Sequence, residues 1–169
     1  MTTPPIELPT TGVTLRAARS DEVDALVDMI NAAYHKTESH VFPGTLRTER
    51  YDLSRLLPEM IVAEVDGVLA ACIHITITPP NAHFGPLAAE VSRHGGGIGS
   101  ILIAHAERVA REARCETMRI EVVKKGGRVP FYERRGYHVT VEHIGQEWNG
   151  GADWGAAGDW HMVEMEKPL

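Results

Sequence analysis

The chain has 169 residues, of which 43% are hydrophobic and 24% are charged, and its formal net charge is −6 at pH 7. A chain of this length buries one substantial core, and the acidic balance argues against a nucleic-acid-binding surface, because phosphate backbones attract clustered Lys and Arg. No apolar run approaches the roughly 20 residues of a membrane span, and the N-terminus lacks the basic and apolar regions of a signal peptide, so we expect a cytoplasmic protein with no membrane partner.

Hydrophobic periodicity predicts strands and helices in one α/β or α+β domain. Residues 1–12, rich in Thr and Pro, are expected to be a flexible lead, and residues 13–169 a single domain. Asp66-Gly67 is the strongest hairpin signal, so the β-rich runs around it are predicted to be antiparallel neighbours. In chain order the expected elements are a strand at 13–18, a helix from Val23, a loop at 35–48, a short helix before Pro58, the hairpin at 60–77, a strand at 83–91, a helix at 98–113, a strand at 117–123, a helix at 130–135, a strand at 137–144 and a last strand near 160–165.

The stretch SRHGGGIGS, residues 92–100, places three glycines before Ile98 and a fourth after it, at the start of a predicted helix. At a strand-to-helix junction the N–H groups of the first helical turn are free and the helix dipole adds positive charge, which favours an anion such as phosphate. The stretch lacks the lysine of a P-loop, and the spacing G-x-G-x-x-G is broken at Ser100 or Leu102. A glycine turn that merely packs a helix against a strand is the alternative.

The run FGPLAAEVSRHGGGIG, residues 84–99, resembles motif A of the GNAT superfamily of acetyl-CoA-dependent N-acetyltransferases, whose core pattern is Gln/Arg-x-x-Gly-x-Gly/Ala. The run PFYERRGY, residues 130–137, resembles motif B of the same superfamily, and the order of elements from 13 to 169 is similar too. The resemblance implies an α+β GNAT fold, with a mixed, mostly antiparallel sheet of about seven strands, about four flanking helices, and a gap between strands 4 and 5 that admits the cofactor. It also implies acetyl-CoA as the cofactor and a primary amine as the acceptor.

Carried over by position, the resemblance assigns the paired glycines to Gly97 and Gly99 and the Gln/Arg position to His94. Gly96 stands where a basic residue is common, so we expect weak pyrophosphate binding that depends more on backbone than on side-chain charge. Arg93, one place off register, either compensates or is simply solvated. The implied cofactor-binding residues are Leu87, Ala88 and Ala89, whose backbone pairs with the pantetheine arm, and His94, Gly95, Gly96, Gly97, Ile98, Gly99 and Ser100.

Acetyl transfer to an amine requires a base for the amine and a proton for the departing thiolate. Tyr132 matches the motif B tyrosine that serves as general acid in the family, and the alternative is a tyrosine packed against the sheet. His83 falls where the histone-acetylating branch carries its glutamate base, with Glu90 and Glu121 as alternatives and a structural role for His83 equally open. The spacings typical of metal ligands are absent from the sequence, which predicts no protein-bound metal.

The resemblance places the acceptor pocket between the loop after the first helix and the loop before the last strand. Their side chains would form an apolar slot with a carboxylate for an ammonium ion, although the loop tryptophans are equally consistent with the contacts of a homodimer. A small-molecule amine and a peptide amine both remain open as acceptors, and an acyl-CoA-binding sensor or accessory module without turnover is the alternative function. The candidate acceptor residues are Tyr34, Glu38, His40 and Phe42 on one side and Trp148, Asp153 and Trp154 on the other.

Overall fold

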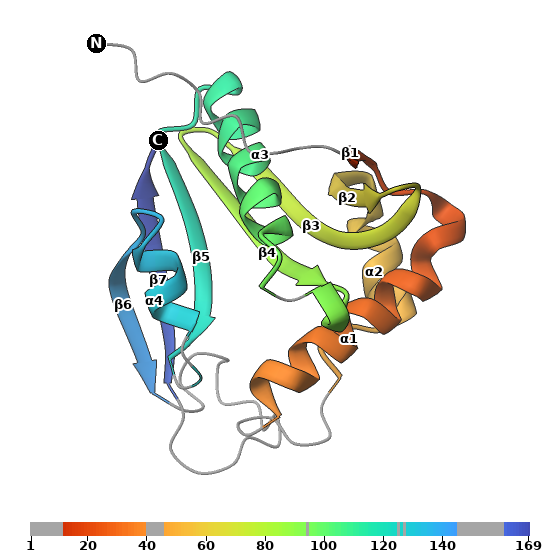
Figure 1. The fold of residues 1–169 in the computed structure, drawn as a ribbon. Helices are drawn as coiled ribbons and strands as arrows, with labels where there is room; N and C mark the ends of the chain where they lie inside the picture. The colour runs from red at the N-terminus through yellow and green to blue at the C-terminus, as the bar shows by residue number, and fades with distance from the viewer. Residues whose placement is uncertain (1–11, 40–45, 94, 125, 127, 145–160) are drawn as a thin grey trace.

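One twisted sheet forms the centre of the molecule, and helices cover both of its faces (Figure 1). The computed structural model describes residues 12–39, 46–93, 95–124, 126, 128–144 and 161–169. Within these residues the sheet has seven strands in the order β1-β2-β3-β4-β5-β7-β6, and every neighbouring pair is antiparallel except β4 and β5. The elements are β1 (Val13–Ala17), α1 (Val23–Glu38), α2 (Arg50–Leu56), β2 (Met60–Val65), β3 (Val68–Thr78), β4 (Asn81–Ala89), α3 (Ile98–Glu112), β5 (Thr117–Val123), α4 (Arg128–Glu133), β6 (His138–Ile144) and β7 (His161–Pro168).

This arrangement confirms the expected mixed, mostly antiparallel sheet with four helices in the described part of the chain. Asp66 and Gly67 both adopt positive φ, at 51° and 79°, so the predicted tight hairpin joins β2 to β3. None of the described helices combines the length and the apolar character that crossing a membrane requires.

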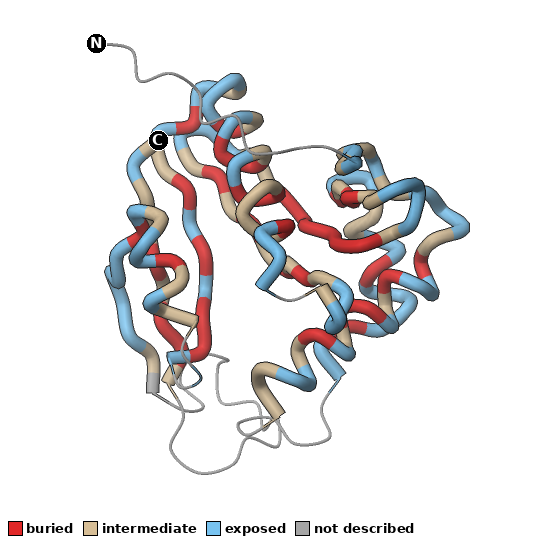
Figure 2. The backbone as a smooth tube through the Cα atoms, in the orientation of Figure 1, coloured by how far each residue is buried: buried red, intermediate tan, exposed pale blue. Residues whose placement is uncertain are grey.

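Each face of the sheet carries its own hydrophobic core, because the side chains of a strand point alternately to opposite faces. On β3, Ala71 and Ile73 belong to the core beneath α3, whereas Cys72 between them belongs to the core beneath α1 and α2. Leu26 of α1 and Leu102 of α3 are fully buried in these two cores. Figure 2 shows the buried residues as a band along the middle strands and the inner sides of the helices. Helices therefore pack against the sheet through a hydrophobic core on each of its faces.

Strands β4 and β5 pair at three positions only, from Asn81 opposite Thr117 to His83 opposite Arg119, and then diverge (Figure 1). A β-bulge in β4 accompanies the divergence, because the β3–β4 register shifts between Ile73 and Ile75. Phe84 lies in the core beneath α3 and Ala88 in the core beneath α1, although strict alternation would put both side chains on one face. The bulge thus reverses the faces of β4 and bends it, as bulges do. The expected separation of strands 4 and 5 is confirmed.

Helix α1 continues to Glu38, beyond His35, where the sequence predicted a loop to begin. The last turn keeps its backbone bonds, since the N–H of Ser39 donates to the carbonyl of His35 at 3.1 Å. The apolar period stops there because this turn borders the cavity described below instead of the hydrophobic core. A helical turn that faces a polar cavity has the same sequence signature as a loop.

Helix α4 begins at Arg128 and ends at Glu133, slightly earlier than the predicted 130–135. Gly136 has φ of +92° and terminates the helix, as predicted. The N–H of Gly136 donates to the carbonyl of Glu133 at 3.0 Å and that of Tyr137 to the carbonyl of Tyr132 at 3.2 Å, the two bonds of a Schellman motif. The Tyr137 hydroxyl then donates to the buried Glu107 of α3 at 2.9 Å. This chain of contacts fixes α4 relative to α3.

Candidate active site

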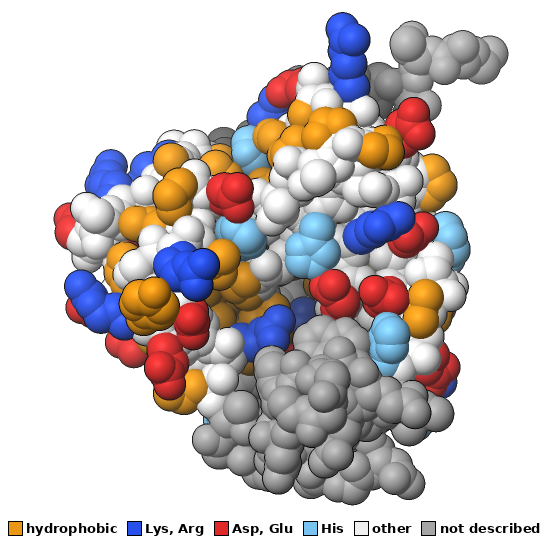
Figure 3. Space-filling view, turned by 180° about the vertical axis from the view of Figure 1, so that it is seen from behind, with side chains coloured by type: hydrophobic (Ala, Val, Ile, Leu, Met, Phe, Trp, Pro, Cys, Tyr) orange, Lys and Arg blue, Asp and Glu red, His pale blue; other side chains and the backbone are white. Residues whose placement is uncertain are grey.

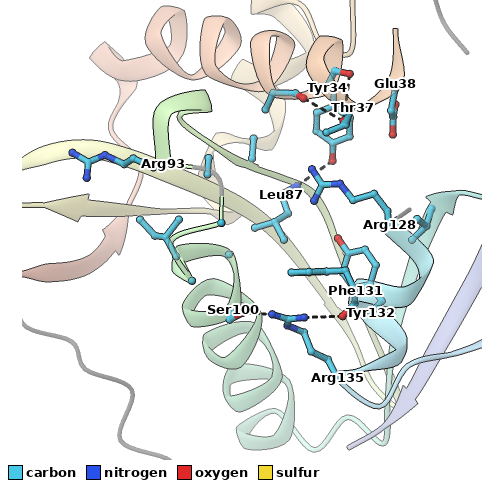
Figure 4. Close-up of a pocket in the computed structure, with 18 of the residues that line it drawn as sticks. Tyr34, Thr37, Glu38, Leu87, Arg93, Ser100, Arg128, Phe131, Tyr132 and Arg135 are labelled. Carbon is cyan, nitrogen blue, oxygen red and sulfur yellow. Dashed lines mark hydrogen bonds between the residues drawn. The ribbon is translucent and has the colours of Figure 1, made fainter. Parts of the chain in front are cut away.

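A cavity of about 450 Å³ lies where β4 and β5 separate. Its walls come from the last turns of α1, the second half of β4, the glycine turn with the start of α3, the end of β5, and α4 (Figure 4). Segments far apart in the sequence therefore meet around one space. The lining residues are Ala33, Tyr34, Thr37, Glu38, Leu87, Ala88, Ala89, Arg93, Gly95, Gly97, Ile98, Gly99, Ser100, Glu121, Val122, Arg128, Phe131, Tyr132 and Arg135.

The glycine turn needs glycine for its backbone conformation. Gly95 and Gly97 both have φ of +83°, a left-handed conformation that other residues rarely adopt, and Gly97 is the N-cap of α3. A side chain at Gly96 would meet the carbonyl oxygen of Arg93 at 3.2 Å. The first bond of the helix runs from the N–H of Ile101 to the carbonyl of Gly97 at 3.3 Å, so the N–H groups that precede it are the free donors of a helix N-terminus. These free N–H donors make the turn suitable for binding an anion.

Five of the seven residues predicted for the glycine turn and the start of α3 line the cavity, namely Gly95, Gly97, Ile98, Gly99 and Ser100. Gly96 does not appear in the lining, and His94 lies outside the described residues.

The strand wall of the cavity consists of Leu87, Ala88 and Ala89, the residues predicted to pair with the pantetheine arm. The N–H of Leu87 donates to the Tyr34 hydroxyl at 3.3 Å, so a side chain from α1 holds this donor in the free protein. Tyr34 is in turn covered by the Arg47 guanidinium, whose carbon lies 4.9 Å from the ring centroid. The N–H of Leu87 therefore lies on the side of β4 that borders the cavity, where it can exchange Tyr34 for another acceptor.

Tyr132 lies in an aromatic cluster and also faces the cavity, a position compatible with both of the roles that the sequence left open. Its ring centroid is 5.0 Å from that of Phe131, 5.9 Å from that of Tyr137 and 6.2 Å from that of Phe84. Its hydroxyl points into the cavity (Figure 4) and has no hydrogen-bond partner among the described residues. Burial raises the pKa of Tyr132 well above its ordinary value, so the phenol stays protonated near neutral pH.

His83 and Glu121 form a hydrogen-bonded pair where the two strands part. The Nε2 of His83 lies 2.5 Å from a carboxylate oxygen of Glu121, and His83 is the last residue of β4 that pairs with β5. The hydrogen bond from His83 is the main cause that lowers the pKa of Glu121, and Arg47 lowers it further. Glu121 lines the cavity but His83 does not, and Glu90 is exposed and lines neither this cavity nor the second one.

Glu121 also borders a second cavity of about 580 Å³ on the face of the sheet opposite α3 and α4. Figure 3 shows this face, with histidine and acidic side chains gathered across its middle. His83, Arg119 and Glu164 line this second cavity. Of the three bases that the sequence suggested, Glu121 alone reaches the cavity that holds Tyr132, and it connects this cavity to the opposite face of the sheet.

Two of the predicted acceptor residues, Tyr34 and Glu38, line the first cavity from the last turns of α1. The remaining candidates, His40, Phe42, Trp148, Asp153 and Trp154, lie outside the described residues.

Three arginines line the cavity as well: Arg93, Arg128 and Arg135. The guanidinium of Arg135 donates to the hydroxyl of Ser100 and, at 2.7 Å, to the carbonyl of Phe131, and its carbon lies 3.6 Å from the Phe131 ring centroid. Sequence reasoning missed Arg128 and Arg135 as site residues. The sequence offered one indication, the basic run beside Tyr132. It could not show that these side chains face the cavity, because that depends on how α4 packs against α3.

A sequence model of the acetyltransferase (GNAT) family matches residues 23–137, more than half of the chain. The matched segment runs from the start of α1 to Tyr137 and contains the glycine turn, Glu121 and α4. No curated protein sequence matches the chain.

Solved acetyltransferase structures share the fold. PaiA N-acetyltransferase from Thermoplasma acidophilum, in complex with coenzyme A, superposes with a TM-score of 0.74 at 16% identity, covering 93% of this chain and 99% of that one. Ribosomal-protein-alanine N-acetyltransferase from Brucella melitensis gives a TM-score of 0.70 at 19% identity, covering 92% and 99%. N-acetylglutamate synthase from Neisseria gonorrhoeae, complexed with coenzyme A and N-acetyl-glutamate, gives 0.70 at 18%, with 93% of this chain spanning 35% of that one. At these identities the likeness is one of fold.

Proposed function

The chain belongs to the GNAT acetyltransferase family, and we propose that it is an N-acetyltransferase that moves the acetyl group of acetyl-CoA to a primary amine by direct attack in a ternary complex. The observation that carries this proposal is the cavity between β4 and β5, which brings the glycine turn, the Leu87–Ala89 edge and the Tyr132 hydroxyl to one space. These three features are what an elongated, phosphate-bearing thioester requires.

The lining of the cavity fits acetyl-CoA along its length. Free N–H groups at the start of α3 suit the pyrophosphate, because a helix N-terminus favours anions. The backbone of β4 offers pairing groups for the pantetheine arm, provided that Leu87 exchanges its bond to Tyr34. When bound, acetyl-CoA supplies an activated acyl group as a thioester.

Glu121 is the best placed base for the acceptor amine. It borders the cavity that contains Tyr132, and its pKa is lowered mainly by the hydrogen bond from His83, so it is a carboxylate at neutral pH. Glu121 accepts the proton that an acceptor ammonium must lose before its nitrogen can attack. His83 orients the carboxylate and keeps it ionised.

Tyr132 provides the proton for the departing sulfur. Its phenol is protonated near neutral pH, since the ordinary pKa of tyrosine is already about 10 and burial raises it further, and its hydroxyl faces the cavity. The acceptor ammonium gives one proton to Glu121 before it attacks, and the second proton, which the nitrogen loses as the amide forms, replaces the one that Tyr132 gives to the departing sulfur, so the products are an amide, a thiol and a protonated Glu121. Glu121 then releases its proton to solvent through the second cavity, which it also borders.

The acceptor proposed for this site is a cationic or aromatic primary amine, in a small molecule or a peptide. The carboxylates of Glu38 and Glu121 line the same cavity and suit an ammonium ion. The organisation of residues 13–169 as one N-acetyltransferase domain behind a lead at 1–12, a cytoplasmic location and a homodimer remain predictions that accompany this proposal.

Two measurements test the function. Coenzyme A and acetyl-CoA are expected to raise the melting temperature, whereas ATP and NAD are not, because the β4 edge suits pantetheine. A shift with NAD alone would contradict the assignment. A screen of thiol release from acetyl-CoA across amine classes then separates an enzyme from a binding module, since binding without release with any amine supports the sensor alternative. A clear preference for alcohols or acidic acceptors would contradict the proposed acceptor class.

A further inference from the structure

The glycine turn brings no basic side chain of its own to the start of α3 in the described part of the chain: Gly95, Gly96, Gly97 and Gly99 carry none. We propose that Arg135, at the end of α4, supplies this missing charge and binds the pyrophosphate of coenzyme A together with the first turn of α3. The proposal rests on the proposed function, because it assumes that coenzyme A occupies the cavity. It adds to the site a phosphate-binding side chain that the sequence did not indicate.

Arg135 reaches the right place. Its guanidinium donates to the hydroxyl of Ser100, the third residue of α3, and so lies beside the helix turn whose N–H groups are free. A guanidinium carries five N–H donors in a planar fork, and the bonds to Ser100 and to the Phe131 carbonyl leave several of them unused. An anion held by the α3 N–H groups would therefore meet the remaining donors, and charge-assisted bonds of this kind are among the strongest in proteins.

The position of Arg135 is fixed before any ligand arrives. The residue immediately precedes Gly136 in the Schellman motif that ends α4, and its guanidinium stacks 3.6 Å from the centroid of the Phe131 ring. Because the side chain is already ordered, binding a phosphate costs little further loss of rotamer freedom.

The charge of Arg135 is not neutralised within the described residues. No carboxylate of a described residue forms an ion pair with it, whereas Arg16, Arg50, Arg108 and Arg119 all pair with Asp or Glu. In a chain with 23 acidic and 17 basic residues, a half-buried arginine that packs against a hydroxyl, a carbonyl and a ring is oriented for a ligand.

The other two arginines of the cavity take different directions (Figure 4). Arg128 extends toward Tyr34 and Leu87, at the end where the acyl group is expected, and the guanidinium of Arg93 extends away from Ser100 and the remaining labelled residues. Arg135 is therefore the arginine that the structure assigns to the phosphate subsite.

The test measures dissociation constants by calorimetry for coenzyme A, dephospho-coenzyme A, which lacks only the 3′-phosphate, and pantetheine, which lacks all phosphates. Arg135→Gln is expected to weaken the binding of the first two by a similar factor, roughly 10- to 100-fold, and to leave pantetheine unaffected. Arg134→Gln is the matched control, because it removes the same charge from an exposed neighbour, and it is expected to change each constant less than about threefold.

Several outcomes separate this inference from the proposed function. If the wild-type protein does not bind coenzyme A, the proposed function fails; if it binds and Arg135→Gln binds equally well, the role of Arg135 alone fails. A loss with coenzyme A but not with dephospho-coenzyme A would place Arg135 at the 3′-phosphate and overturn the pyrophosphate assignment.

Because Arg135 also bonds the backbone of α4, the melting temperature of each ligand-free variant is measured first. Arg135→Lys retains the charge and is expected to recover part of the lost affinity, whereas an equal loss in folded Lys and Gln variants overturns the role of the charge. If the Gln variant does not fold, the Lys variant is compared with wild type at two salt concentrations. The proposal is supported if the Lys variant binds coenzyme A more weakly than wild type and its affinity still falls steeply as the salt concentration rises. An affinity equal to that of wild type at both salt concentrations overturns it.

Discussion

The two ends of the cavity are built in different ways. The phosphate end is made of backbone, with Gly95 and Gly97 in left-handed conformations and the free N–H groups of α3, and it carries the positive charge of Arg135. The acceptor end is made of side chains, the carboxylates of Glu38 and Glu121 together with Arg128. The first end suits an anionic cofactor, the carboxylates of the second suit the amine proposed above, and we expect substitutions at the two ends to change different kinetic constants.

The largest effect is expected at the acceptor end. Glu121→Gln removes the proposed base while keeping its shape, and we expect kcat to fall roughly 100- to 10,000-fold at neutral pH with little change in the affinity for coenzyme A. The measurement is steady-state thiol release together with calorimetric binding.

Glu164→Gln is the matched control for this change. Glu164 lies on β7, the strand next to β5, and also pairs with a histidine, His143 of β6, at 3.1 Å. It does not line the first cavity. Its substitution should leave kcat within about threefold of wild type. A Glu121→Gln enzyme with wild-type kcat would remove the base from this end of the cavity.

Tyr132→Phe tests the point where the two ends meet. The ring keeps its contacts with Phe84 and Phe131, so coenzyme A should bind as before, while kcat falls roughly 10- to 1000-fold because the sulfur loses its proton donor. Thiol release is measured over a pH range under conditions in which chemistry limits turnover. Wild-type kcat with an unchanged alkaline limb would make Tyr132 a packing residue only.

The two ends also differ in how far the sequence could predict them. The glycine turn is a local feature: the spacing of glycines before a helical period indicates an anion site without knowledge of the rest of the fold. The His83–Glu121 pair joins residues 38 apart and depends on three paired positions between β4 and β5, so the sequence could name both residues but not their contact. Arg135 and Ser100 are 35 residues apart and meet only through the packing of α4 on α3.

A further difference concerns polar surfaces that face a cavity. The part of α1 from His35 onward, with Thr37 and Glu38 in the cavity lining, was predicted to be a loop because it lacks an apolar stripe, yet its backbone is helical. Hydrophobic periodicity detects faces that meet a core, and a functional cavity removes that signal where the site is built.

At the phosphate end, Gly97→Glu is expected to abolish the thermal shift with coenzyme A and to weaken binding roughly 10- to 100-fold. A side chain at φ of +83° strains the turn, and a carboxylate repels the anion from the helix N-terminus. Gly67→Glu is the control, since Gly67 also has a left-handed φ, of +79°, and open space around it, but lies in the β2–β3 hairpin and does not line the cavity. Binding retained by a folded Gly97→Glu protein would place the phosphate elsewhere.

The smallest expected change in kcat is that of His83 substitutions, which determine whether His83 or Glu121 is the base. His83 does not line the first cavity, and its hydrogen bond is the main cause that lowers the pKa of Glu121. Removing the bond in His83→Ala should raise the pKa of Glu121, because only part of the lowering comes from Arg47 and burial acts in the opposite direction. The active form is the carboxylate, so activity should be lost at a higher pH than in wild type as the pH falls, while the plateau of kcat changes less than about threefold.

His83→Gln supplies a neutral N–H donor in place of the ring and should return the acid limb of the profile part of the way toward wild type. If His83 were itself the base, as its position on the strand first suggested, both variants would lose kcat roughly 100-fold or more at every pH, because neither alanine nor glutamine accepts the proton. The pH profile of kcat therefore distinguishes a residue that takes the proton from one that tunes its neighbour. The structure favours the second role for His83, since the carboxylate and not the ring borders the cavity in which we propose that the amine binds.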